Sequence, residues 1–280
     1  MCATCGCSDD QGVRIIDVRP ESTGRPHTHA DGRTHSHEGD HGGAHSHPHR
    51  HDATTETLTL ETRILAKNDE LASHNRAWLR DRGVAAINLM SSPGSGKTTL
   101  LERTVGALAG SMPVCVIEGD QETTFDADRI AATGVPVLQV NTGSGCHLDA
   151  SMVRTAMHAL DPPGGIVLIE NVGNLVCPAL FDLGEQARVL IMSVTEGADK
   201  PLKYPHIFAA ATIVVLNKID LMPYVDFDLS RFERDVGLVN PRAEILPISA
   251  TRGDGLAAWL AWLQAAPVGA RSTSAPASGR

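Results

Sequence analysis

Seven short apolar runs divide the middle of the chain, and none of them shows a regular alternation with polar residues. They are rich in Val and Ile, and stretches with a helical spacing of apolar residues separate them. The runs are residues 84–90, 114–117, 137–140, 166–169, 189–194, 212–216 and 244–248. Strands that are apolar on both faces are typical of buried parallel sheets, and alternating strands and helices are typical of α/β proteins. The pattern predicts a mostly parallel sheet with helices on both faces.

One globular domain is predicted over residues 58–266, and it begins with a long helix over residues 58–82, where apolar residues recur at helical spacing. Before it, residues 1–57 form an arm that is rich in Gly, His, Asp, Thr and Pro from residue 8 onward. Such a segment cannot bury enough apolar surface to offset chain entropy, so we expect the arm to be disordered. Residues 267–280, rich in Pro, Ser, Ala and Gly, predict a disordered tail.

A glycine-rich loop joins the first apolar run to an apolar helix and has the sequence Ser-Ser-Pro-Gly-Ser-Gly-Lys-Thr-Thr. Its glycines let backbone N–H groups wrap around an anion at the N-terminus of the helix. We expect Lys97 to reach the β- and γ-phosphates and the Thr98 hydroxyl to bind Mg²⁺, as in P-loop NTPases. The alternative, a turn with a surface lysine, is disfavoured by the strand–helix junction, although Ser91 replaces the usual first glycine. The predicted phosphate-binding residues are Gly94, Ser95, Gly96, Lys97, Thr98 and Thr99.

Asn217-Lys218-Ile219-Asp220 follows a later apolar run and indicates the choice of base. An Asp220 carboxylate can accept from guanine N1–H and N2–H₂, whereas adenine offers no matching donor pair. Asn217 would contact the base edge, and the stem of Lys218 would cover the base. In Ser249-Ala250, which follows the last apolar run, a backbone N–H can meet guanine O6. Behind a phosphate loop these motifs favour GTP and GDP over ATP.

Two other predicted strands end in acidic side chains, Asp120 and Glu170. Carboxylates at the C-terminal edge of a parallel sheet face the phosphate site. Together with Lys97 they are our candidate catalytic residues, and with Thr98 they are candidates for holding Mg²⁺. Gly173 could donate its N–H to the γ-phosphate, as glycines of switch loops do. The alternative is that each acid only caps the following helix.

A thiol, an imidazole and a second thiol come from Cys146, His147 and Cys177, a donor set that suits Zn²⁺ or Ni²⁺. These residues supply only three ligands, so a fourth would come from water or a second subunit. Buried inert cysteines are an open alternative, and a disulfide is a weaker one. Cys177 follows Glu170 by seven residues. A metal ion on Cys177 and a γ-phosphate near Gly173 would therefore both act on the conformation of residues 170–177.

The composition adds 13 His and 6 Cys to an acidic chain of net charge −9. Cys2, Cys5 and Cys7 offer soft donors that favour Ni²⁺, although zinc or copper would also bind. A dense histidine tract would bind several divalent ions, and a solvated linker is its alternative interpretation. Its members are His27, His29, His35, His37, His41, His45, His47, His49 and His51.

The acidic balance argues against nucleic-acid and anionic-membrane partners, because both are polyanions. No apolar run approaches the roughly 18 residues of a membrane span. The N-terminus has neither the basic region nor the apolar stretch of a signal peptide, so we expect a cytoplasmic protein.

These motifs together resemble those of the hydrogenase nickel-incorporation GTPases, the HypB family. They are the terminal Cys-x-x-Cys-Gly-Cys, the His-rich arm, the phosphate loop, Glu-Gly-Asp-Gln, Gly-Ser-Gly-Cys-His-Leu-Asp, Glu-Asn-Val-Gly-Asn-Leu-Val-Cys-Pro and Asn-Lys-Ile-Asp. The resemblance spans nearly the whole chain except the length of the arm and the C-terminal tail. Urease-accessory G proteins share the fold but carry Cys-Pro-His instead, and the Ser91 departure is shared by the HypB family.

The resemblance implies a GTPase that inserts nickel into the large subunit of [NiFe]-hydrogenase. It further implies a low intrinsic rate, a GTP-dependent homodimer with nickel or zinc on Cys146, His147 and Cys177 at its interface, and the zinc-containing nickel chaperone HypA as partner. It implies a high-affinity nickel site at the terminal cysteines in some members and nickel storage by the arm. Two alternatives stay open, a nickel-buffering protein with an incidental G domain and a GTPase that loads another nickel enzyme such as urease.

Overall fold

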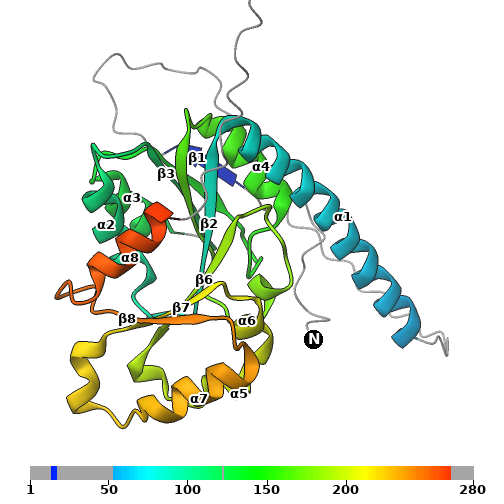
Figure 1. Ribbon diagram of the computed structural model, residues 1–280. Helices are drawn as coiled ribbons and strands as arrows, with labels where there is room; N and C mark the ends of the chain where they lie inside the picture. The colour runs from blue at the N-terminus through cyan, green and yellow to red at the C-terminus, as the bar shows by residue number, and fades with distance from the viewer. Residues whose placement is uncertain (1–13, 18–52, 122, 266–280) are drawn as a thin grey trace, which may run out of the picture.

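Eight strands form one sheet in the computed structural model, which describes residues 14–17, 53–121 and 123–265. Their order is β1-β4-β3-β5-β2-β6-β7-β8, and β1 pairs antiparallel with β4 while every other neighbouring pair in the described sheet is parallel. The strands are β1 (Arg14–Asp17), β2 (Val84–Ser91), β3 (Val114–Asp120), β4 (Val137–Asn141), β5 (Gly165–Glu170), β6 (Ala187–Ser193), β7 (Ile213–Asn217) and β8 (Glu244–Pro247). The predicted mostly parallel sheet is confirmed (Figure 1).

Helices cover both faces of the sheet, as the apolar runs predicted. The α-helices are α1 (Ala53–Arg82), α2 (Lys97–Leu108), α3 (Phe125–Ala131), α4 (Ala150–Leu160), α5 (Lys200–Lys203), α6 (Pro205–Ala210), α7 (Leu229–Val239) and α8 (Leu256–Ala265). Three short 3₁₀ helices are η1 (Cys177–Ala179), η2 (Val194–Glu196) and η3 (Ile219–Tyr224). Alternate residues of β2 separate the faces, since Ile87 packs in one core with α2, α3 and α8, and Ala86 packs in another with α1 and α4.

The N-terminal arm departs from the expected disorder at β1. Its register runs from Arg14 opposite Asn141 to Asp17 opposite Leu138, which places β1 at the edge of the sheet. Without it, β4 would present a row of unpaired backbone groups, and pairing with a short strand satisfies them. The expected long helix is found, but α1 begins at Ala53 rather than at residue 58.

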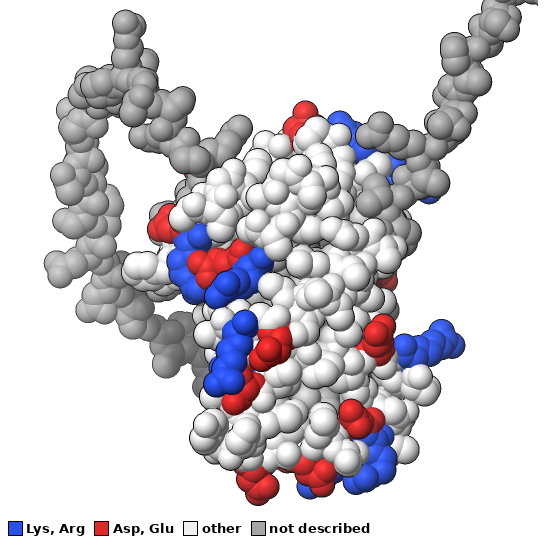
Figure 2. Space-filling view, turned by 60° about the vertical axis from the view of Figure 1, so that its left-hand side comes forward, with Lys and Arg blue, Asp and Glu red and all other residues white. Residues whose placement is uncertain are grey.

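Several expectations fall outside the described residues. They concern the terminal cysteines Cys2, Cys5 and Cys7, the histidine tract of residues 27–51, and the tail at 267–280. Among the described helices, none is long and apolar enough to cross a bilayer. On the face shown in Figure 2, basic side chains lie next to acidic ones in small groups, with uncharged surface between the groups.

The sheet brings the functional motifs to one edge. The phosphate loop connects the C-terminal end of β2 to α2, and β2 lies between β5 and β6 near the middle of the sheet. Because β3, β5 and β7 run parallel to β2, the ends that carry Asp120, Glu170 and Asn217 reach the same edge. This edge is where ligands bind in open α/β sheets.

Candidate nucleotide site and its adjoining thiol cluster

A pocket of about 560 Å³ opens at this edge of the sheet. Its lining combines the whole phosphate loop with the ends of β3, β5 and β7, including Asp120, Gly173 and Lys218, which the sequence assigned to the nucleotide. It also includes Glu118, Gln121, Asp126, Arg129 and Val172, which sequence reasoning did not assign. The expected phosphate-binding residues therefore lie around one cavity.

Glu170 joins the two side chains of the phosphate loop that were expected to act on phosphate and metal. Its Oε1 atom accepts hydrogen bonds from Lys97 Nζ at 2.6 Å and from Thr98 Oγ1 at 2.7 Å. Glu170 is fully buried, and its Oε2 atom has no hydrogen-bond partner among the described residues. The structure thus brings Lys97, Thr98 and Glu170 together.

Glu118 is a second buried carboxylate of this site, and it lies opposite Glu170 in the register of β3 and β5. Burial, with a further contribution from the negative charge of Glu170, raises the pKa of Glu118 to about 9, although Lys97 opposes the shift. Its Oε2 atom also lacks a partner within the described chain. The position two residues before Asp120, on the same side of the strand, is the sequence signal that could have identified it.

The oxygen atoms around Thr98 fit a small hard cation. Thr98 Oγ1 and the unpartnered Oε2 atoms of Glu118 and Glu170 are the carboxylate and hydroxyl donors that Mg²⁺ prefers. Asp120 lines the same pocket, but its Oδ2 atom also accepts from Thr123 N at 2.8 Å and Thr123 Oγ1 at 2.7 Å. Asp120 therefore also orders the turn before α3, although the N-cap of that helix is Thr124, and the catalytic role of Asp120 stays a prediction.

The expected base-binding residues are tied to the phosphate loop. Asn217 is 1% exposed, and its Nδ2 atom donates to Ser95 O at 2.9 Å. Gly96, at a φ of +93°, lies against this amide, and an added Cβ would approach Asn217 Nδ2 to 2.5 Å, so only glycine fits there. Lys218 Nζ donates to Gly94 O at 2.6 Å, which extends its stem along the loop.

Asp220 and Ser249 lie together as expected, since Ser249 Oγ donates to Asp220 Oδ1 at 2.7 Å. The Ala250 N–H donates to Asn217 Oδ1 at 3.0 Å, and the expected contact of a backbone N–H of Ser249-Ala250 with guanine O6 stays a prediction. Asn217 therefore connects the phosphate loop with the loop after β8, and its own contact with a base edge stays a prediction.

Cys146, His147 and Cys177 come together, with one potential ligand atom from each and all three atoms within 4.8 Å of one another. The two Sγ atoms are 3.1 Å apart, well beyond the length of about 2.05 Å of a disulfide bond, so the disulfide alternative is not formed between them. The His147 ring stacks on Phe181 with ring centroids 3.9 Å apart. Burial lowers the pKa of His147, against a smaller opposing effect of Asp149, which favours the neutral imidazole that binds metals. We call these three residues the thiol cluster.

The third described cysteine, Cys115, lies apart from the thiol cluster. It is buried within β3, in the apolar core between the sheet and α4, and burial raises the pKa of its thiol. Cys115 is therefore part of the core of the domain.

One segment, residues 170–177, connects the pocket with the thiol cluster. In the middle of the segment, Gly173 lies against the phosphate loop, where an added Cβ would approach Pro93 N to 3.2 Å. The next residue, Asn174, faces the cluster side: its Nδ2 atom donates to Cys146 O at 3.3 Å, and its Oδ1 atom accepts from Val176 N at 2.8 Å. Asn174 is a functional candidate that motif spacing did not reveal, because its role depends on a contact with another loop.

The fold and the pocket define a P-loop nucleotide-binding protein with the thiol cluster beside the nucleotide site. Residues 85–247 match the family described as "CobW/HypB/UreG, nucleotide-binding domain". The hydrogenase maturation factor HypB of Escherichia coli K12 is 56% identical over 208 residues, which cover 74% of this chain and 72% of that protein. The chain therefore belongs to the CobW/HypB/UreG family and, within it, to the hydrogenase maturation factors HypB.

Two further relatives bear on the chemistry. The hydrogenase/urease maturation factor HypB of Helicobacter hepaticus is 41% identical over 206 residues, or 72% of this chain and 84% of that one. The crystal structure of HypB from Helicobacter pylori in complex with nickel matches with a TM-score of 0.68 and 38% identity, and covers 71% of this chain and 94% of that one.

Proposed function

We propose that this protein hydrolyses GTP and uses the reaction to control nickel held by the thiol cluster during insertion into the large subunit of [NiFe]-hydrogenase. The observation that carries the proposal is the continuous path through residues 170–177. Glu170 bonds to Lys97 and Thr98, and Asn174, four residues further along the segment, bonds to Cys146 O. Two ligands that bias one shared segment are thermodynamically coupled.

The nucleotide half of the proposal assigns a role to each group in the pocket. Backbone N–H groups of the phosphate loop hold the phosphates, Lys97 donates to their oxygens, and Gly173 approaches the γ-phosphate from the opposite side. Asp220, oriented by Ser249, selects guanine. Thr98, Glu170 and Glu118 or Asp120 would hold Mg²⁺, which neutralises charge on the β- and γ-phosphates when bound.

The metal half rests on the donor chemistry of the thiol cluster. Two thiolates and a neutral imidazole suit Ni²⁺ or Zn²⁺, and the nickel complex of the Helicobacter pylori relative supports nickel. Three donors leave a position for water or for a second copy of the chain. Val176 and Leu180, which flank the short helix that begins at Cys177, are 48% and 51% exposed and could bury their side chains in a GTP-dependent homodimer.

The remaining partners follow from membership of the HypB family. We propose HypA as the nickel donor, the terminal cysteines as a further nickel site, and the histidine tract as a nickel store. We propose a cytoplasmic location, because a reducing compartment suits a metal site built on two cysteines. The name of the Helicobacter hepaticus relative supports a second candidate function, delivery of nickel to a urease.

Titration with nickel and zinc tests the proposed coupling directly. Full-length protein is titrated in the presence of Mg²⁺ with GDP and, separately, with a non-hydrolysable GTP analogue. We expect the affinity of the thiol cluster for the metal to differ between the two states by about 5- to 150-fold. Equal affinities would refute coupling through residues 170–177.

A genetic experiment separates maturation from storage. A deletion strain is complemented at low nickel with wild type, with Lys97→Ala, or with Lys203→Ala as a control for an exposed lysine. We expect hydrogenase activity to be lost only with Lys97→Ala. Full activity with Lys97→Ala would favour nickel storage, and urease assayed in the same strains decides between the two client enzymes.

A further inference from the structure

Helix α1 carries two asparagines within a contact that is otherwise apolar. Leu79 of this helix packs in one core with Val153 and Met157 of α4. Asn68 and Asn75 are buried in the same region, with 5% and 1% of their surfaces exposed. They lie seven residues apart and therefore on one face of the helix, two turns from each other. A buried amide is costly unless it is hydrogen-bonded, so its partners show what it holds in place.

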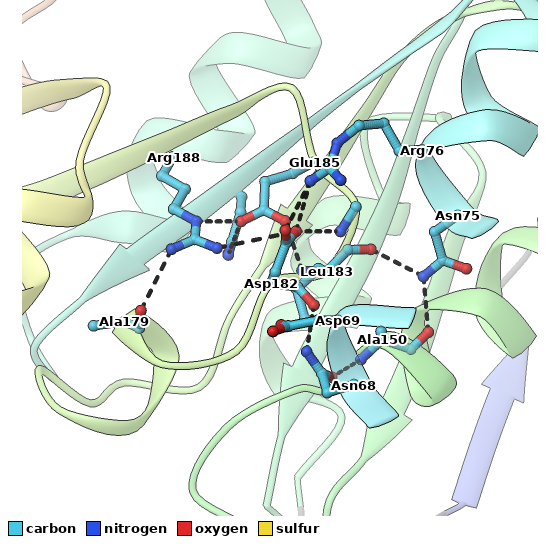
Figure 3. A network of polar contacts seen from close by, with 12 residues as sticks. Asn68, Asp69, Asn75, Arg76, Ala150, Ala179, Asp182, Leu183, Glu185 and Arg188 are labelled. Atoms are coloured by element: carbon cyan, nitrogen blue, oxygen red, sulfur yellow. Dashed lines mark hydrogen bonds and ion pairs between the residues drawn. The ribbon is translucent and has the colours of Figure 1, made fainter. Parts of the chain in front are cut away.

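Both asparagines join the same two segments of the domain (Figure 3). Asn68 Oδ1 accepts from Ala150 N at 2.9 Å, and Asn68 Nδ2 donates to Asp182 O at 2.8 Å. Asn75 Nδ2 donates to Ala150 O at 2.8 Å and to Leu183 O at 2.9 Å. The two side chains thus form a pair of bridges between the start of α4 and the loop at residues 182–183.

Each of these two segments also carries ligands of the thiol cluster. Ala150 follows His147 by three residues, and Asp182 follows Cys177 by five. Three residues span at most about 10 Å of chain, so a displacement of Ala150 also changes the position of His147. Phe181, next to Asp182, stacks on the His147 ring, which brings the two segments into direct contact beside the ligands.

The second segment is attached to α1 by further contacts. Asp182 accepts from Arg76 Nη2 with both carboxylate oxygens, each at 2.8 Å. Gly184, at a φ of +88°, lies so close to the helix that an added Cβ would approach Ala72 O to 2.6 Å. Because these contacts and the apolar core remain when one asparagine is removed, we expect single substitutions to leave the fold intact.

We propose that Asn68 and Asn75 are positioning residues for the metal, which set the spacing between the Cys146–His147 segment and the Cys177 segment. Apolar packing holds α1 on the domain but is not directional, whereas four hydrogen bonds fix where each segment lies on the helix. The inference rests on the proposed metal binding by the thiol cluster. It makes α1, the element that follows the N-terminal arm in the chain, part of the support of the cluster.

The experiment measures nickel binding by a signal that reports the thiol cluster alone. The full-length chain carries Cys2→Ser, Cys5→Ser and Cys7→Ser, so that a thiolate-to-nickel charge-transfer band arises from Cys146 and Cys177. Histidines of the arm bind nickel without this band. The band is recorded during nickel titration with GDP present, and thermal unfolding of each variant is followed in parallel.

Three variants are compared in this background. Asn68→Ala and Asn75→Ala each remove one bridge. Asn240→Ala is the matched control, because its amide also donates to backbone carbonyls, Phe208 O and Ala211 O, both at 2.9 Å, but far from the cluster in sequence and on other elements. A fourth variant, Asn68→Asp, keeps the acceptor for the Ala150 N–H and tests for partial rescue.

We expect Asn68→Ala and Asn75→Ala to weaken nickel binding by about 10- to 100-fold and to change the band at saturation, since supporting groups of metal ligands typically have effects of this size. Asn68→Asp should fall between Asn68→Ala and the parent, and Asn240→Ala should bind as the parent does. Parental binding by both alanine variants, or equal weakening by Asn240→Ala, would overturn the inference. A parent without any band would instead show that the proposed metal binding is wrong.

Discussion

Replacing Glu118 by glutamine is expected to raise the free energy of unfolding of the nucleotide-free protein, by an amount that grows with pH. Glu118 is buried opposite Glu170, and burial followed by the charge of Glu170 raises its pKa from 4.5 to about 9. Glutamine has nearly the same shape but cannot ionise. The substitution therefore removes the pH-dependent contribution of Glu118 to the free energy of unfolding and changes little else.

The sign follows from the two states of the chain. Above pH 4.5 the unfolded chain releases the proton of Glu118, whereas the folded protein keeps it up to about pH 9. The unfolded state then binds fewer protons, so the contribution of Glu118 to stability is fully present below pH 4.5 and falls as pH rises. The slope is about 1.4 kcal/mol per pH unit, which amounts to about 3 kcal/mol by pH 7.

Urea unfolding between pH 5.5 and 8 measures this effect in protein free of nucleotide and Mg²⁺. The difference between Glu118→Gln and wild type should increase with a slope of about 1.4 kcal/mol per pH unit, because other titrating groups cancel in the difference. Glu70→Gln, at an exposed position of α1, is the control for the same change of residue type. Parallel stability curves for Glu118→Gln and wild type would refute the reasoning.

Four further substitutions test the assignments. Asp220→Asn should weaken GTP binding on the order of 1000-fold and favour xanthine nucleotides, whose 2-oxo group accepts from the amide; competition binding measures both effects. Lys97→Ala should slow GTP hydrolysis on the order of 100-fold, measured by phosphate release, without changing nickel affinity in the absence of nucleotide. Asn174→Ala should make nickel affinity nearly equal with GDP and with a GTP analogue, since the link to Cys146 O is lost. Cys115→Ser should leave the nickel charge-transfer band unchanged, because this cysteine lies in the core of β3.

The fold was predictable because its main signals are local. The six strands from β2 to β7 are largely buried and apolar on both faces, whereas β8 lies at the edge of the sheet with two of its four residues exposed. Each predicted run lies within a strand or reaches at most one residue past it. The strand β1 was not predictable in the same way. It is a four-residue edge strand in a polar segment, and it depends on the exposed edge of β4, which exists only after folding.

The parts of the site that could be predicted are those in which a ligand-binding motif has defined residue types at fixed spacing in the sequence. The phosphate loop, Asp220 with Ser249, and the three members of the thiol cluster were found on this basis. Glu118 was missed because its sequence signal is weak: it lies two residues before Asp120, and the strand pairing that places Glu170 beside it exists only in the folded sheet. Asn68 and Asn75 were missed because their partners lie 75 to 114 residues away in the sequence.

If nickel and GTP both act on residues 170–177, each must change the binding affinity of the other, because coupling between two binding sites is reciprocal. If the GTP state strengthens nickel binding tenfold, a bound nickel ion strengthens GTP binding tenfold by the same amount of free energy. Glu170 and Asn174 lie four residues apart in this short segment, so a shift of the backbone at either residue changes the position of the other. Nickel loading would therefore bias the protein toward its GTP state, and hydrolysis, which removes the γ-phosphate beside Gly173, would weaken the hold on the metal. Delivery of the metal would then follow hydrolysis rather than precede it.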